Sequence, residues 1–221
     1  MWLGATVAAS FLVLIIFGVE IYRTAPPFPT KIVVSDGEVL YEGQDIKDGQ
    51  NVWQSMGGQT VGSIWGHGAY IAPDWNADYL HRETEMLLDL LAQKDGKTYK
   101  DLPEDEQAKY LVQLRKELRT NTYDAASGVI TFSPERAQVA RALADYYTKL
   151  FMDDPSMDHV RKSYAIPKGA IKDPARMAQM NAFFTWTTWV CSTNRPGSDV
   201  TYTNNWPYEP VIGNKPSTSL Q

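Results

Sequence analysis

Residues 1–19 carry no charged side chain, and residues 11–17 form an unbroken apolar run. At about 1.5 Å of rise per residue, a helix through this segment approaches the roughly 30 Å hydrocarbon thickness of a bilayer. Trp2 and Tyr22 lie at its two ends, where amphipathic rings favour the membrane interfaces. We therefore predict a transmembrane anchor helix over residues 1–25.

A cleaved signal peptide is the alternative for this segment. No basic region precedes the apolar run, and the sequence YRTAP at residues 22–26 is a poor small-residue cleavage site. An anchor is therefore the favoured interpretation. Charge leaves its orientation open, because the positive-inside rule expects cations on the cytoplasmic side, and the nearest ones, Arg23 and Lys31, lie on the side of the soluble domain.

The remainder of the 221-residue chain is long enough to bury a core. We expect one soluble domain over residues 26–193 and an ordered loop over residues 194–221 that leads back to the membrane. The net charge is -5 and basic residues form no cluster, so nucleic acid is not an expected partner. Cys191 is the single cysteine, which excludes an internal disulfide and a thiolate metal cluster.

Periodicity predicts a mainly α fold with a small β-hairpin. Residues 32–34 and 39–41 alternate around a turn at residues 35–37, as in a hairpin. Residues 128–132 fit one further short strand. Ser133 followed by Pro134 is a strong helix start. The apolar positions that follow at helical spacing are Val139, Ala140, Leu143, Tyr147 and Leu150.

Two more helices frame the middle of the chain. Asp74 or Asn76 can cap a helix whose leucines face inward and whose Glu83 faces water. Residues 177–190 are apolar around most of a helix and must be covered on more than one side.

Between these elements, residues 57–75 read GGQTVGSIWGHGAYIAPDW and are dense in glycine. They do not form a phosphate-binding P-loop, because no lysine follows at the required position and no strand leads into the loop. Glycines here instead allow left-handed turns and close approach to another surface.

This loop resembles one in the cytochrome c subunit of bacterial nitric oxide reductases, where a C-x-x-C-H haem motif precedes the run G-x-G-A-Y-x-A-P-[DE]. Counting back from that run places Gly58, Val61 and Gly62 where the two cysteines and the axial histidine would stand. Covalent haem attachment requires those three side chains, so the resemblance is to a haem-free version of the loop. The matching residues are Gly66, Gly68, Ala69, Tyr70, Ala72, Pro73 and Asp74.

The resemblance extends over nearly the whole chain. The segments APPFP, GQNVWQSMGG, DWNADYLHRE, TWVCSTNRPG and TYTNNWPYEP follow the order of quinol-dependent nitric oxide reductases. In those enzymes a haem-free cytochrome c-like domain precedes a catalytic membrane domain with b-type haems and non-haem iron, which joins two NO, two electrons and two protons into N2O and water. The resemblance implies that this chain is a non-catalytic segment or subunit of such an oxidoreductase. A related nitric oxide dismutase would share much of this domain.

The same resemblance implies location and partners. The anchor would lie in the bacterial inner membrane with the domain on the periplasmic side, and the redox site would lie outside this chain. The expected partners are the polytopic haem-bearing catalytic domain or subunit, membrane lipid and membrane quinol.

A calcium ion is also implied at the interface. In the related reductases it is held by haem propionates, a glutamate of the catalytic subunit, and a backbone carbonyl and a tyrosine that correspond to Gly68 and Tyr70. Calcium prefers six to eight oxygen ligands, so these two residues would bind it only within the complex. The alternative is that Tyr70 is a packed aromatic.

Other candidate sites have simpler explanations. His67, His81 and His159 are scattered and predict surface residues rather than a transition-metal site, although His67 could line an interface. A hydrolase triad of Ser63, His67 and Asp74 is not predicted, because the sequence around Ser63 forms no nucleophile elbow.

Cys191 ends an apolar helix and fits a small buried hydrophobe. For Arg195 two interpretations stay open, pairing with carboxylates or haem propionates near the membrane and an ordinary surface salt bridge.

Two functions of other classes remain. The first is a stand-alone membrane-anchored periplasmic binding module, with the helix at residues 177–190 lining a ligand groove. The second is a hydrolase, for which the sequence offers no convergent catalytic set. Co-purification with a haem-containing membrane subunit distinguishes the reductase hypothesis from both.

Overall fold

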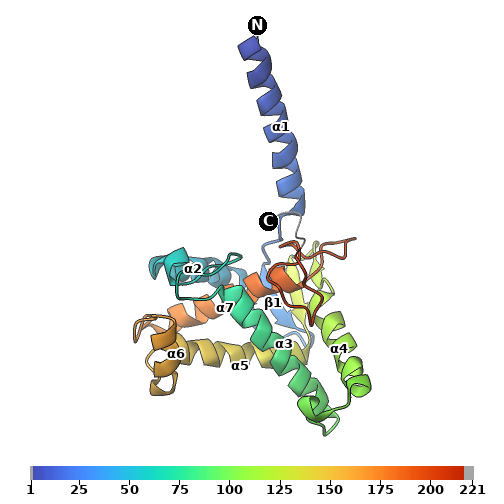
Figure 1. Ribbon diagram of the computed structural model, residues 1–221, viewed down its shortest axis with the longest axis vertical. Helices are drawn as coiled ribbons and strands as arrows, with labels where there is room; N and C mark the ends of the chain where they lie inside the picture. The colour runs from blue at the N-terminus through green and yellow to red at the C-terminus, as the bar shows by residue number, and fades with distance from the viewer. Residues whose placement is uncertain (1, 217–221) are drawn as a thin grey trace.

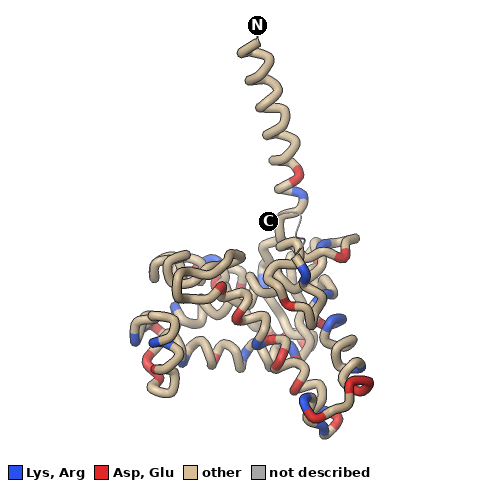
Figure 2. Tube along the Cα trace, viewed as in Figure 1, with Lys and Arg blue, Asp and Glu red and all other residues tan. Residues whose placement is uncertain are grey.

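The computed structural model describes residues 2–216. Helix α1 (Trp2–Thr24) leaves the rest of the chain as a separate rod and buries no residue (Figure 1). Charged side chains are confined to its C-terminal end, whereas both signs are interspersed over the domain below it (Figure 2). By length and composition α1 can cross a membrane, which is consistent with the predicted anchor.

The domain is mainly helical, as predicted, and its helices pack around α7 (Figure 1). Three short 3-10 turns, η1 (Gly58–Val61), η2 (Tyr99–Asp101) and η3 (Pro155–Met157), lie between the longer elements. The helices are α2 (Gly43–Ser55), α3 (Trp75–Lys94), α4 (Glu104–Arg119), α5 (Pro134–Phe151), α6 (Asp158–Ser163) and α7 (Pro174–Ser192).

The predicted hairpin is present, but it belongs to a four-stranded sheet with the order β2-β1-β4-β3. Strand β1 (Lys31–Val34) pairs antiparallel with β2 (Val39–Glu42) and parallel with β4 (Val129–Phe132), and β4 pairs with β3 (Tyr123–Asp124). The hairpin leaves one edge of β1 unpaired, and β4 satisfies those backbone groups. Strands of two to four residues carry no sequence signal for a partner so far along the chain.

Helices α2 and α7 cross in direct backbone contact. A Cβ at Gly49 would lie 2.0 Å from the carbonyl oxygen of Gln179, so only glycine permits the approach. Beyond this crossing α7 is buried on all sides from Met180 to Ser192. The predicted cover on more than one side is confirmed, and the hypothesis that this helix lines an open ligand groove is wrong.

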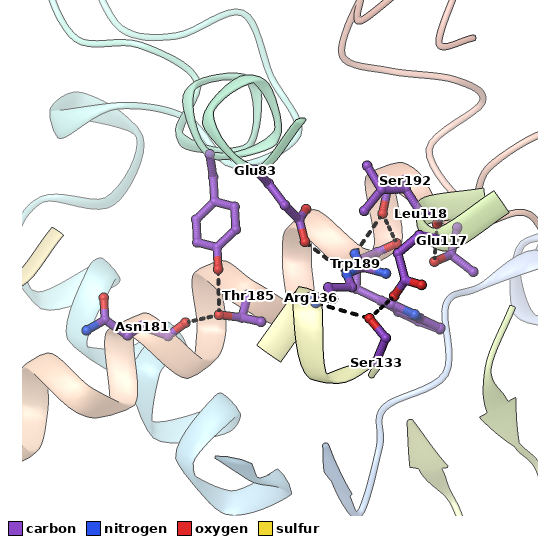
Figure 3. A network of polar contacts seen from close by, with 11 residues as sticks. Glu83, Glu117, Leu118, Ser133, Arg136, Asn181, Thr185, Trp189 and Ser192 are labelled. Carbon is purple, nitrogen blue, oxygen red and sulfur yellow. Dashed lines mark hydrogen bonds and ion pairs between the residues drawn. The ribbon is translucent and has the colours of Figure 1, made fainter. Parts of the chain in front are cut away.

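A buried polar network joins α3, α5 and α7 (Figure 3). Arg136 Nε donates to Glu83 Oε1 at 2.8 Å, and Arg136 Nη2 donates to Ser192 Oγ at 3.1 Å. Glu83 is 2% exposed, so the prediction that it faces water was wrong. Burial raises the pKa of the Glu83 carboxyl, and the Arg136 guanidinium opposes that rise.

Residues 194–216 form an ordered loop on the side of the domain from which α1 departs (Figure 1). Asn214 Nδ2 donates to the Cys191 carbonyl at 3.0 Å, and Arg119 donates to Asn214 Oδ1 at 2.8 Å. These bonds hold the loop to α4 and α7. Residues 217–221 of the predicted loop lie outside the described residues.

Candidate functional site

The glycine-dense loop connects α2 to α3 and lies on the side of the domain that faces α1 (Figure 1). Its first half turns through η1 and closes over the end of α2, where Trp53 Nε1 donates to the Gly62 carbonyl at 3.2 Å. Gly62 has φ +117, a conformation that residues with a side chain rarely adopt. The three positions predicted to correspond to haem attachment, Gly58, Val61 and Gly62, thus lie in one tight turn.

Trp75 fills the space beside Gly62. A Cβ at Gly62 would lie 2.2 Å from Trp75 Nε1 and 2.8 Å from the Pro73 carbonyl oxygen. The indole donates to the Val61 carbonyl at 3.0 Å and stacks on Phe184 with ring centroids 6.0 Å apart. No side chain at position 62 fits while Trp75 holds this place.

Asp74 organises the second half of the loop. Its Oδ2 accepts from Ser63 Oγ at 2.7 Å and from the Gly66 backbone N–H at 2.6 Å, and its Oδ1 caps α3 by accepting from Ala77 N–H at 3.0 Å. Burial raises the pKa of the Asp74 carboxyl, and these hydrogen bonds oppose the rise. Of the two caps predicted for this helix, Asp74 is the one used.

The hydrolase triad is absent from this arrangement. Ser63 is 2% exposed, and its hydroxyl is occupied by Asp74 and by the Gly68 N–H, which donates to it at 2.7 Å. His67 lies elsewhere, edge-on to Trp206 with ring centroids 4.6 Å apart. Ser63 and Asp74 are structural braces for the loop.

A second attachment fixes the loop to α7. Trp65 Nε1 donates to the Thr187 carbonyl at 3.1 Å, and Trp65 N–H donates to Asn76 Oδ1 at 3.0 Å. Asn76 Nδ2 in turn donates to Thr187 Oγ1 at 2.8 Å. Asn76 was predicted only as an alternative helix cap, and its bond to Thr187 was not predicted, because nothing in the spacing of the sequence signals a contact between residues 111 positions apart.

The tip of the loop projects from the domain. Ala69 N–H donates to the Ala72 carbonyl at 2.9 Å, which closes a turn that includes Tyr70 and Ile71. Tyr70 is fully exposed at 103% and Ile71 is 52% exposed, so the alternative that Tyr70 packs inside its own domain is wrong. Gly68, with φ +83, precedes this turn, so the two predicted calcium ligands lie on the same short segment.

Within residues 2–216 no group of three or more histidine, cysteine or acidic side chains is placed to hold a metal ion. His81 Nδ1 lies 3.0 Å from Glu209 Oε2, which ties α3 to the C-terminal loop.

The remaining sequence candidates have local roles. Cys191 is fully buried, as predicted, and burial raises the pKa of its thiol. Arg195 donates to the Tyr202 carbonyl at 3.0 Å and to Asn204 Oδ1 at 2.7 Å. Neither partner is a carboxylate, so the salt bridge proposed for Arg195 is not formed within the described chain.

Together these features define a mainly helical domain on an apolar N-terminal helix, with a hydrogen-bonded loop whose tip exposes Tyr70 and Ile71. Residues 29–208 match the family model of the NorB cytochrome c-like domain of nitric oxide reductase. Because the match spans most of the chain, the protein belongs to this family. It is thereby associated with nitric oxide reductase and with the other parts of that complex. A search of curated proteins found no match.

Proposed function

We propose that this chain is the haem-free, non-catalytic cytochrome c-like part of a quinol-dependent nitric oxide reductase. It caps the haem-bearing membrane domain and helps to shape the calcium and quinol sites. The reduction of two NO to N2O and water takes place in that partner domain. Family membership over residues 29–208 supports the association.

The contact between Gly62 and Trp75 carries the haem-free part of the proposal. The residues do not fit a covalent haem, because Cys191 is the single cysteine and is buried in α7. An axial ligand at position 62 would overlap the Trp75 indole. Without a haem here, electrons from a soluble cytochrome c have no carrier in this chain, and quinol in the membrane is the donor that the proposal assigns.

The exposed loop tip supports a capping role. Tyr70 and Ile71 offer an aromatic and an aliphatic side chain to a partner, while Asp74 and Trp65 hold the loop rigid. Rigid aromatic anchors contribute strongly to protein interfaces. We assign this tip to the contact with the catalytic membrane domain.

The same tip fits a partial calcium site. The Gly68 carbonyl and the Tyr70 hydroxyl are hard oxygen ligands of the type that calcium prefers. Two ligands do not fill its coordination shell, so the haem propionates and a carboxylate of the partner domain would complete it. Bound there, calcium would supply positive charge between the two domains.

Placement in the bacterial inner membrane, with the domain on the periplasmic side, follows from the same proposal. Helix α1 is long enough to span the bilayer, and Pro26, Pro27 and Pro29 form a stiff exit from it.

Purification of the tagged chain from its native membranes in mild detergent tests the proposal. We expect a polytopic subunit or domain with a b-type haem spectrum, NO reduction with a quinol donor, and no haem retained on this chain after acid-acetone extraction. Covalent haem on the chain, or a haem-free monomer with no partner, would contradict the proposal.

A further inference from the structure

A cavity of about 500 Å³ lies beside the turn of residues 58–62, away from the loop tip. It is enclosed by the end of α2, by η1, by the end of α5 and by the segment of residues 166–173 that leads into α7. The interior is apolar and includes Val52, Val61, Phe151, Ile166 and Ile171.

The size of this cavity is that of a small-molecule site. It opens to solvent at the exposed residues Ser55, Lys172 and Arg176, and its volume lies within the roughly 300–1,000 Å³ of small-molecule sites, which are mostly apolar. Its outer wall is also fixed. Gly169 N–H donates to the Met152 carbonyl at 2.7 Å, and Ile171 N–H donates to the Phe151 carbonyl at 3.0 Å, so the site is formed before any ligand arrives.

The mouth carries an excess of positive charge. Lys172, Asp173 and Arg176 line it, and the Asp173 carboxylate is already engaged as the N-cap of α7, where it accepts from Ala175 N–H at 2.9 Å. Arg176 Nη2 donates to Ser55 Oγ at 2.7 Å, which holds the guanidinium at the rim. Among the described residues neither Lys172 nor Arg176 forms an ion pair with a carboxylate.

An apolar interior beside two cations that form no ion pair with a carboxylate selects one ligand chemistry. We propose that this cavity binds an amphipathic monocarboxylate with a medium-length aliphatic chain. The chain would occupy the space between Val61 and Ile171, and the carboxylate would accept hydrogen bonds from Arg176 and Lys172 at the mouth. A neutral alcohol of the same length would lack that pairing, and an aliphatic cation would be repelled.

Calorimetric titration of the full chain in phosphatidylcholine nanodiscs tests this site, with empty nanodiscs as the blank. The probes are octanoate, 1-octanol and octyltrimethylammonium. We expect saturable binding of octanoate and at least fivefold weaker binding of the other two probes, because a charge-assisted pair at a partly exposed rim is worth about that factor. No saturable octanoate binding, or equal binding of octanoate and octanol, would overturn the proposal.

Substitutions then locate the ligand. Arg176→Gln should weaken octanoate binding about fivefold, while Lys116→Gln, which removes an exposed cation on α4, should leave it unchanged. Ala170→Phe should fill the cavity and abolish binding, with Val61→Phe as a second filling variant if the first does not fold by near-ultraviolet circular dichroism. Equal octanoate affinity in a folded filled variant, or in Arg176→Gln, would place the ligand elsewhere. These outcomes are independent of whether the chain associates with a reductase.

Discussion

The indole nitrogen of Trp75 lies where a side chain at Gly62 would begin, 2.2 Å from the position of a Cβ at that glycine. The indole is fixed there by its hydrogen bond to Val61 and by the rings around it. The turn that corresponds to a haem-attachment motif is therefore closed by packing as well as by the identity of its residues.

Replacing Gly62 with alanine should lower the free energy of unfolding by about 3 kcal/mol or more, because backbone strain adds to the overlap with Trp75. Gly37→Ala is the matched control, since Gly37 has φ +96 and no atom within 4 Å of the place that an added methyl group would take. Only strain acts there, at about 1–2 kcal/mol. Urea unfolding of the soluble domain in the full chain measures both losses, and equal losses would show that the Trp75 contact costs nothing.

Restoring the attachment residues should not restore haem. We expect the triple variant Gly58→Cys, Val61→Cys, Gly62→His to carry no covalent haem in cells that mature c-type cytochromes, because Trp75 occupies the space beside the new histidine. Adding Trp75→Ala opens that space and should allow some attachment. Haem staining of denatured gels gives the result. Attachment in the triple variant with Trp75 intact would contradict this prediction.

The sequence predicted the elements with strong local signals. The apolar run indicated α1, the Ser133 and Pro134 pair indicated the start of α5, and the unusual apolar width of residues 177–190 required a buried α7. The loop motif led to the correct family. Contacts between distant residues could not be predicted from the sequence, because periodicity describes one helix at a time.

Glu83 illustrates that limit. A glutamate beside other polar residues on a helix ordinarily faces solvent, and only the arrival of Arg136 from α5 allows it to be buried. The parallel pairing of β1 with β4 was not predicted for the same reason, since the sequence of neither strand identifies its distant partner. The exposure of Tyr70 depends on a turn braced by Asp74, which local pattern could not distinguish from a packed aromatic.

The buried Glu83 predicts a pH dependence with an unusual sign. Its folded-state pKa is raised by burial, so the folded chain binds this proton more tightly than the unfolded chain. The contribution of Glu83 to stability is then fully present below its unfolded pKa and is lost as pH rises through the folded value. Glu83→Gln removes the titration, so the stability of the wild type minus that of the variant should fall as pH rises above the ordinary glutamate pKa. Urea unfolding at several pH values measures this difference, and a constant or rising difference would contradict the assignment.

Asp74→Asn should loosen the loop while keeping the cap of α3. The asparagine carbonyl can still accept from Ala77 N–H, but its amide would face the Ser63 hydroxyl or the Gly66 N–H, both of which donate to Asp74. The expected loss is about 2–3 kcal/mol, with faster hydrogen exchange at Gly66 and Gly68. Asp154→Asn, at the less buried cap of η3, should cost only a few tenths of a kcal/mol. Equal effects of the two substitutions would remove Asp74 from its bracing role.

Tyr70→Phe tests the metal part of the proposed function without altering the fold, because the side chain is fully exposed in the isolated chain. Loss of the hydroxyl removes one oxygen ligand, and we expect calcium to bind the purified reductase complex at least about tenfold more weakly. Mass spectrometry of metal content after dialysis against graded chelator gives the affinity, and the b-haem content per chain reports assembly. Tyr208→Phe is the control, since Tyr208 is also exposed, at 66%, but lies on the C-terminal loop. If calcium affinity is unchanged in Tyr70→Phe, the Tyr70 hydroxyl is not a ligand of the metal.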